Sequence, residues 1–221
     1  TRLSLLDRGV VIAIAHVRGG GEMGRDWYEH GRLLEKKNSF TDFVAAAEHL
    51  GATGLVDPAR LGAEGRSAGG LLMGAVANLA PERFRAIIAG VPFVDTLTTI
   101  LDPSLPLTVG EWEEWGDPLH DPQVYAYMKE YTPYENVRAV EYPAIFASTS
   151  LNDTRVFFVE PAKWVARLRE TVTSDQAERP IVFRCEMVAG HGGRSGRYRK
   201  WEQRADELAW LLDQLGATTL L

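Results

Sequence analysis

One pentapeptide of this sequence has the residue types and spacing of an activated serine nucleophile. Gly65-Arg66-Ser67-Ala68-Gly69 follows the pattern G-x-S-x-G. It lies between a predicted strand over residues 61–64 and a predicted helix that begins near Ala68. The glycines permit a tight turn that exposes the Ser67 hydroxyl, and the Ala68 N–H at the helix start could stabilise an oxyanion. The alternative is a strand-to-helix turn without a catalytic role.

A serine nucleophile needs a base to take its proton, and His191 is the best candidate. The sequence Gly190-His191-Gly192-Gly193 forms a glycine-rich loop directly after a predicted strand over residues 181–187. An imidazole there could reach over the carboxyl edge of a sheet. The other histidines fall in a predicted strand, a predicted helix or irregular segments, where a structural or surface role is simpler: His16, His49, His30 and His120.

A carboxylate must orient that histidine, and Asp153 has the expected position. It comes five residues after Ser148, the end of a predicted strand over residues 144–148. The order serine, aspartate, histidine is that of the α/β-hydrolase fold. Asp153 could instead only cap the following helix, because aspartate is a favoured cap. Arg155, two residues on, is compatible with a surface charge or with a substrate ligand.

The elements around these residues alternate between strands and helices. Strands are predicted over residues 10–17, 61–64, 84–91, 144–148 and 181–187, and helices over 39–50, 68–79, 162–170 and 201–215. This alternation predicts an α/β fold with a mostly parallel sheet and helices on both faces. The apolar run 10–17 predicts a strand buried on both faces. Residues 92–133, rich in proline, aromatic and acidic residues, predict an excursion over the edge of the sheet.

Composition restricts the compartment and the partners. With 221 residues, 45% hydrophobic and 24% charged, the chain is expected to form one domain over residues 1–221. A net charge of −6 argues against nucleic acid and favours basic peptides as partners. No apolar run approaches the length of a membrane span. The single cysteine, Cys185, cannot form an internal disulfide, which fits a reducing, cytoplasmic location. No metal or organic cofactor is needed for the predicted chemistry.

Five segments together resemble the prolyl oligopeptidase family of serine peptidases, and within it the oligopeptidase B group. They are Arg18-Gly19-Gly20-Gly21-Glu22, residues 65–70, Gly110-Glu111-Trp112-Glu113-Glu114-Trp115-Gly116, Asn152-Asp153-Thr154-Arg155 and residues 190–193. The resemblance implies cleavage of short peptides after arginine or lysine, with Glu111 and Glu113 binding the basic side chain. A desolvated guanidinium does require an opposing carboxylate. The alternative is a solvated acidic face. Prolyl oligopeptidases use an arginine at the position of Arg155, and the resemblance therefore implies that Arg155 binds a substrate carbonyl.

The resemblance also implies that residues 1–221 are a partial catalytic domain. Family members carry a β-propeller and further strands at the N-terminal side, which are expected in the same parent chain. Residues 10–17 would match the fourth strand of the fold, and a missing third strand would leave a gap beside residues 61–64. A second oxyanion donor, an upstream tyrosine, would also be missing, so the fragment could be inactive. Alternatives are a prolyl or acylaminoacyl peptidase, a carboxylesterase, or a non-catalytic hydrolase-fold module.

Overall fold

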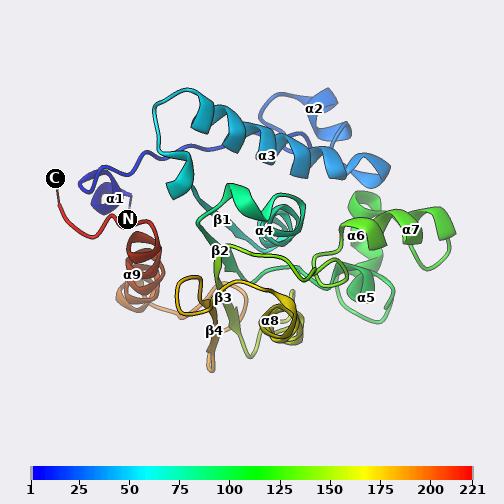
Figure 1. Cartoon of the computed structure of the whole chain (residues 1–221). Helices are drawn as coiled ribbons and strands as arrows, with labels where there is room; N and C mark the ends of the chain where they lie inside the picture. Colours follow the sequence, from blue (N-terminus) through cyan, green and yellow to red (C-terminus); the bar gives the residue numbers. More distant parts are fainter. Residues whose placement is uncertain (1, 221) are drawn as a thin grey trace.

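The computed structural model describes residues 2–220 and contains a parallel sheet (Figure 1). Its strands are β1 (Gly62–Arg66), β2 (Ala86–Gly90), β3 (Ala144–Ser150) and β4 (Ile181–Glu186). They pair in the order β1-β2-β3-β4, all parallel. Chain order and spatial order therefore coincide, and the carboxyl ends of all four strands lie along one edge of the sheet.

Helices cover both faces of this sheet, as the alternating pattern predicts. The α-helices are α1 (Leu3–Leu6), α2 (Arg25–Glu29), α3 (Lys37–Ala52), α4 (Ala68–Leu79), α5 (Thr96–Ile100), α6 (Thr108–Trp115), α7 (Pro122–Tyr131), α8 (Val159–Thr171) and α9 (Arg197–Gln214). Single-turn 3₁₀ helices occur at Leu33–Glu35, Pro58–Arg60 and Pro81–Arg83. None of the helices within residues 2–220 is long and apolar enough to cross a membrane.

Successive residues of the central strands point to opposite faces, so each face has its own apolar cluster. Ile87 of β2 and Ile145 of β3 belong to the cluster that includes buried residues of α4 and α8. Ile88 and Phe146, one residue further along, belong to the cluster formed with the leucines of α9. Figure 1 shows α9 on one side of the sheet and α4 and α8 on the other. The predicted α/β architecture is confirmed.

The segment between β2 and β3 leaves the sheet, as expected from its composition. It contains α5, α6 and α7, which lie together at one end of the molecule (Figure 1). The Thr108 hydroxyl of α6 donates to the Thr99 carbonyl at 3.0 Å, and the Trp112 indole donates to the Ile100 carbonyl at 3.2 Å. These two hydrogen bonds join α6 to α5.

The predicted buried strand over residues 10–17 is wrong. The segment forms no strand, and the side chains of Val11 and Ile14 are exposed, at 50% and 62%. A groove of about 1380 Å³ separates residues 10–15 from β1, and within the described chain β1 pairs only with β2. Burial of a strand depends on neighbouring strands, and none flanks this segment. The groove lies where the resemblance implied a gap in the sheet.

Candidate active site

The turn between β1 and α4 presents Ser67 in a strained conformation. Ser67 is the residue before α4 and has φ 57° and ψ −120°, a backbone conformation that costs on the order of 1–3 kcal/mol. Gly65 is required here, because a Cβ atom would lie 2.1 Å from the Gly69 carbonyl oxygen. Gly70 is also required, since its Cβ would lie 2.4 Å from the Cα of Pro92. Gly65 and Gly70 therefore permit close packing of the backbone around the half-buried Ser67.

Ser67, His191 and Asp153 form a continuous hydrogen-bonded chain. Nε2 of His191 lies 3.1 Å from Oγ of Ser67, and Nδ1 lies 2.7 Å from Oδ2 of Asp153. An ionised carboxylate only accepts hydrogen bonds, so Nδ1 carries the proton and Nε2 is left to accept from the serine hydroxyl. This is the tautomer in which the imidazole can act as a general base.

Asp153 is held on both of its oxygens. Its side chain is fully buried, and Oδ1 accepts hydrogen bonds from the backbone N–H groups of Arg155 (2.9 Å) and Val156 (3.0 Å). Asp153 does not cap α8, because that helix begins at Val159 after Phe158. Its second oxygen is therefore free to face His191, and the turn that follows β3 sets its direction.

Backbone hydrogen bonds join the aspartate loop to the histidine loop. The Leu151 N–H donates to the Glu186 carbonyl at 2.8 Å, and the Asn152 N–H donates to the Ala189 carbonyl at 3.2 Å. Within the histidine loop, the Gly193 N–H donates to the Gly190 carbonyl at 3.0 Å. The distance between Asp153 and His191 is thus set by main-chain contacts between the ends of β3 and β4.

Ala68 offers an amide where an oxyanion would form. It is the first residue of α4 and follows the serine directly, so its N–H has no acceptor within the helix. The positive end of the α4 dipole adds to the attraction for negative charge. The expected oxyanion donor is therefore next to Ser67, at the N-terminus of a twelve-residue helix.

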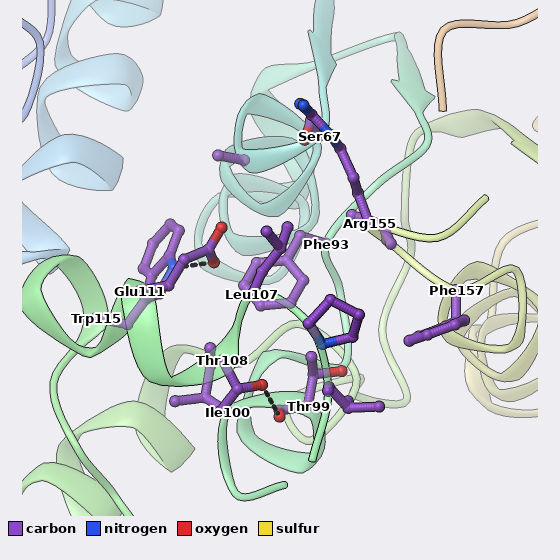
Figure 2. Close-up of a pocket in the computed structure, with 14 residues that line it drawn as sticks. Ser67, Phe93, Thr99, Ile100, Leu107, Thr108, Glu111, Trp115, Arg155 and Phe157 are labelled. Atoms are coloured by element: carbon purple, nitrogen blue, oxygen red, sulfur yellow. Dashed lines mark hydrogen bonds between the residues drawn. The ribbon is translucent and has the colours of Figure 1, made fainter. Parts of the chain in front are cut away.

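A small pocket of about 90 Å³ opens beside Ser67 (Figure 2). Its lining residues include Ser67, Ala68, Phe93, Thr99, Ile100, Leu107, Thr108, Glu111, Trp115, Arg155, Val156 and Phe157. The walls are mostly apolar, and its two charged residues are Glu111 and Arg155. Glu111 lies between Thr108 and Trp115 on one face of α6, while Arg155, an exposed residue, comes from the loop after β3. A pocket of this kind accommodates one side chain.

Glu113 lies outside the lining of this pocket. Its side chain is exposed, and its backbone carbonyl accepts a hydrogen bond from Arg32 at 3.0 Å. Two residues along a helix correspond to a rotation of roughly 200°, so Glu113 and Glu111 occupy different faces of α6. The structure therefore does not bring the two expected substrate-binding carboxylates together.

Glu114, the third acidic residue of α6, is paired inside the protein. It accepts from the Lys36 ammonium and, at 3.0 Å, from the Tyr28 hydroxyl. Burial lowers the pKa of Lys36, and the charge of Glu114 opposes that effect. Glu111 is thus the carboxylate of α6 that faces the pocket.

A second buried carboxyl group, Glu160 of α8, lies behind the pocket wall. Its side chain accepts from the Thr99 hydroxyl at 2.6 Å and from the Asp95 N–H at 3.0 Å. Burial, the largest effect, raises the pKa of Glu160 to about 7; the charge of Asp95 acts in the same direction and that of Lys163 against it. Asp95 itself is paired with Lys163 at 2.5 Å. Sequence patterns do not single out Glu160, because an isolated glutamate at a helix start gives no signal of burial.

The raised pKa of Glu160 is expected to make the protein less stable as the pH rises. In the unfolded chain this carboxyl group ionises near pH 4.5 and in the folded chain near pH 7, so the folded state holds a proton that the unfolded state has lost. The free energy of unfolding is expected to decrease by roughly 2.5 kcal/mol between pH 5 and pH 8 through this group. Glu160→Gln should remove that decrease in urea titrations at the two pH values. Glu170→Gln, at an exposed position of α8, should retain it; equal pH dependence in all three proteins would contradict the assignment.

The chain is similar over nearly its whole length to known peptidases. The model of the prolyl oligopeptidase family matches residues 1–218. Dipeptidyl aminopeptidase BI of Pseudoxanthomonas mexicana is 52% identical over 219 residues, which cover 99% of this chain and 30% of the relative. Protease 2 of Moraxella lacunata is 52% identical over 215 residues, covering 97% of this chain and 31% of the relative. The chain therefore spans about a third of the length of these relatives.

Solved structures show the same similarity. Oligopeptidase B from Leishmania major superposes with a TM-score of 0.96 at 50% identity, over 100% of this chain and 30% of that protein. Oligopeptidase B from Trypanosoma brucei, in a closed form with covalently bound antipain, gives a TM-score of 0.95 at 49% identity. The match covers 100% of this chain and 31% of that protein. Sequence and fold thus agree, and the chain belongs to the prolyl oligopeptidase family of serine peptidases.

Proposed function

We propose that this chain carries the catalytic centre of a serine endopeptidase that cleaves short peptides after arginine or lysine. The observation that supports this most directly is the hydrogen-bonded chain of Ser67, His191 and Asp153 beside a pocket whose lining contains the Glu111 carboxylate. Its similarity to oligopeptidase B is consistent with the same assignment. Residues 1–221 are proposed to be part of one catalytic domain, and the remainder of a longer parent chain is its expected partner.

The geometry supports acyl transfer in two steps. Oγ of Ser67 attacks the carbonyl carbon of the scissile bond, and its proton passes to Nε2 of His191. The carbonyl oxygen becomes negatively charged and is stabilised by the Ala68 N–H. His191 then donates the proton to the leaving amine, so that an acyl-enzyme on Ser67 remains. Water, deprotonated by the same imidazole, hydrolyses this ester and restores the serine.

Side-chain selection is assigned to the pocket beside Ser67. The apolar wall formed by Phe93, Val156 and Phe157 can cover the methylene groups of an arginine or lysine. Glu111 would then oppose the cation at the end of that side chain. Arg155 carries the same charge as such a substrate, so we assign it to a substrate carbonyl instead. Short basic peptides are accordingly the proposed substrates, and the reducing environment suited to a single cysteine makes the cytoplasm the proposed compartment.

Removing the charge of Glu111 is expected to abolish the preference for basic residues. The Glu111→Gln variant should show a kcat/KM ratio of arginine to phenylalanine substrates about 100-fold lower than the unchanged enzyme, because a desolvated cation loses its counter-charge. The measurement is a panel of peptide substrates that differ only in arginine, lysine, proline or phenylalanine before the scissile bond. It requires the protein at its full natural length.

Glu113→Gln is the matched control for this experiment. It removes the same charge from the same helix, but from an exposed residue outside the pocket. The arginine to phenylalanine ratio should change by less than about threefold, as for a screened surface charge. If Glu111→Gln leaves the ratio unaltered, basic specificity is wrong, and the panel then distinguishes a prolyl or acylaminoacyl peptidase from a carboxylesterase.

A further inference from the structure

The carboxylate of Glu111 is held in place by the indole of Trp115. Nε1 of Trp115 donates a hydrogen bond to Oε2 of Glu111 at 2.9 Å, and Figure 2 shows this bond at the wall of the pocket. The two residues are four positions apart on α6, so their side chains lie on the same face of the helix. Oε1 of Glu111 has no partner among the hydrogen bonds of the described residues, and it is the oxygen left for a ligand.

Trp115 is itself firmly positioned. Only 6% of its surface is exposed, and its ring packs against Phe93 with centroids 5.6 Å apart and planes inclined by 55°. The Lys36 ammonium lies 4.7 Å from the centroid of the same ring. Such aromatic and cation–π contacts restrict the indole to one orientation. The direction of its N–H bond is therefore determined by the packing between α6, the segment after β2 and the start of α3.

Lys36 forms no ion pair with Glu111 among the described residues. Lys36 is buried and forms an ion pair with Glu114, so it stabilises the indole from its face without neutralising the pocket carboxylate. A neutral N–H donor can orient Glu111 and still leave its charge available to a substrate. A cationic partner at the same place would compete with the arginine or lysine side chain of the peptide.

We propose that Trp115 is a positioning residue for substrate specificity, which fixes the Glu111 carboxylate before the peptide binds. A free glutamate side chain loses rotamer freedom when it forms an ion pair, and this loss weakens binding. The indole restricts those rotamers in advance. The inference rests on the proposed role of Glu111 as the counter-charge for a basic residue, and it concerns binding through Glu111 and not the chemistry at Ser67.

The test is a Trp115→Phe variant of the protein at its full natural length. Phenylalanine retains an aromatic ring against Phe93 but removes the N–H donor. We expect the kcat/KM ratio of arginine to phenylalanine substrates to fall about tenfold, mainly through a higher KM for arginine substrates, because preorganisation acts on binding. An unaltered ratio would overturn the proposal and leave the bond as a means of satisfying a buried indole.

Trp112→Phe is the matched control. It removes an indole N–H from the same helix, but that group donates to the Ile100 carbonyl and not to Glu111. The arginine to phenylalanine ratio should remain within about threefold of the unchanged enzyme. A fall as large as that of Trp115→Phe would attribute the effect to general loosening of α6 and would also overturn the proposal.

Failure of this inference can be distinguished from failure of the proposed function. If Glu111→Gln removes the preference for arginine and Trp115→Phe does not, the positioning role alone is wrong. If Glu111→Gln has no effect, the specificity assignment is wrong as well. In the double variant, Trp115→Phe should cause no further fall, since both changes act through one carboxylate. Should Trp115→Phe not fold, 3-benzothienylalanine at position 115 replaces only the N–H by sulfur, and the same tenfold fall is expected.

Discussion

Replacement of Ser67 by alanine is expected to lower kcat on the order of 10⁶-fold, the largest effect predicted for any single change in this protein. The alanine variant lacks the Oγ atom that we propose forms the acyl-enzyme, while His191 and Asp153 remain in place. Oγ lies 3.1 Å from Nε2 of His191, so the deletion removes both the attacking atom and the proton donor. A fluorophosphonate probe followed by peptide mapping should label Ser67 in the unchanged protein and nothing at this position in the variant.

The matched control for the labelling experiment is Ser195→Ala. Ser195 is exposed and lies in the same segment as His191, between β4 and α9. This variant should retain the label and the activity. Full hydrolytic activity in Ser67→Ala would exclude Ser67 as the nucleophile and would favour a non-catalytic role for the hydrolase fold. A folded protein that is not labelled at Ser67 would contradict the triad assignment itself.

Replacement of Asp153 by asparagine is expected to lower kcat by roughly 10⁴-fold at neutral pH without unfolding the protein. The structure indicates which way the new amide would face. Oδ1 of Asp153 accepts from the N–H groups of Arg155 and Val156, so the amide oxygen of asparagine should take that side. Its NH₂ group then faces Nδ1 of His191, which must become an acceptor. The proton moves to Nε2, where it prevents His191 from accepting the proton of Ser67.

Asp175→Asn is the control for this change of chemistry. Asp175 also accepts a backbone hydrogen bond through its carboxylate, from the Ala177 N–H at 2.9 Å, but it is exposed and belongs to the segment between α8 and β4. The Asp175→Asn variant should have the same activity as the unchanged enzyme. Activity of Asp153→Asn within tenfold of the unchanged enzyme would show that Asp153 does not set the histidine tautomer, and that its hydrogen bonds to the loop are its main role.

Several features of the site could be predicted because they depend on short segments. The glycines around Ser67 indicate a tight turn whatever the rest of the chain does, and strand or helix periodicity can be recognised within ten residues. The helix predicted over residues 68–79 is α4 with the same bounds. Ser67, Asp153 and His191 each follow a strand of one parallel sheet, so the order of the strands brings them to a common edge. Their hydrogen bonds were therefore expected from local patterns combined with one fold rule.

The proposed specificity residues are less predictable, because their positions depend on α6, a helix that the sequence pattern does not indicate. The sequence presents Glu111, Glu113 and Glu114 as equivalent acids within a stretch of four residues. Once α6 forms, its rotation directs Glu111 into the pocket and leaves Glu113 exposed. Glu114 pairs with Lys36, which is 78 residues away in the chain. The four-residue spacing between Glu111 and Trp115 is the sequence signal for their contact. It indicates a contact only if the segment is helical, because residues four apart then lie on one face.

The sequence by itself determined the turn around Ser67, the chain order of Ser67, Asp153 and His191, and the α/β class, because these depend on local backbone preferences and on periodicity. Only the tertiary structure decided which carboxylate faces the pocket, which oxygen of Asp153 faces His191, and that Glu160 is buried. It also decided that residues 10–17 lie outside the sheet. Their apolar character favours burial, but burial requires a neighbouring strand, and β1 is separated from them by a groove. Contacts between distant segments, and not the segments themselves, are the physical origin of these features.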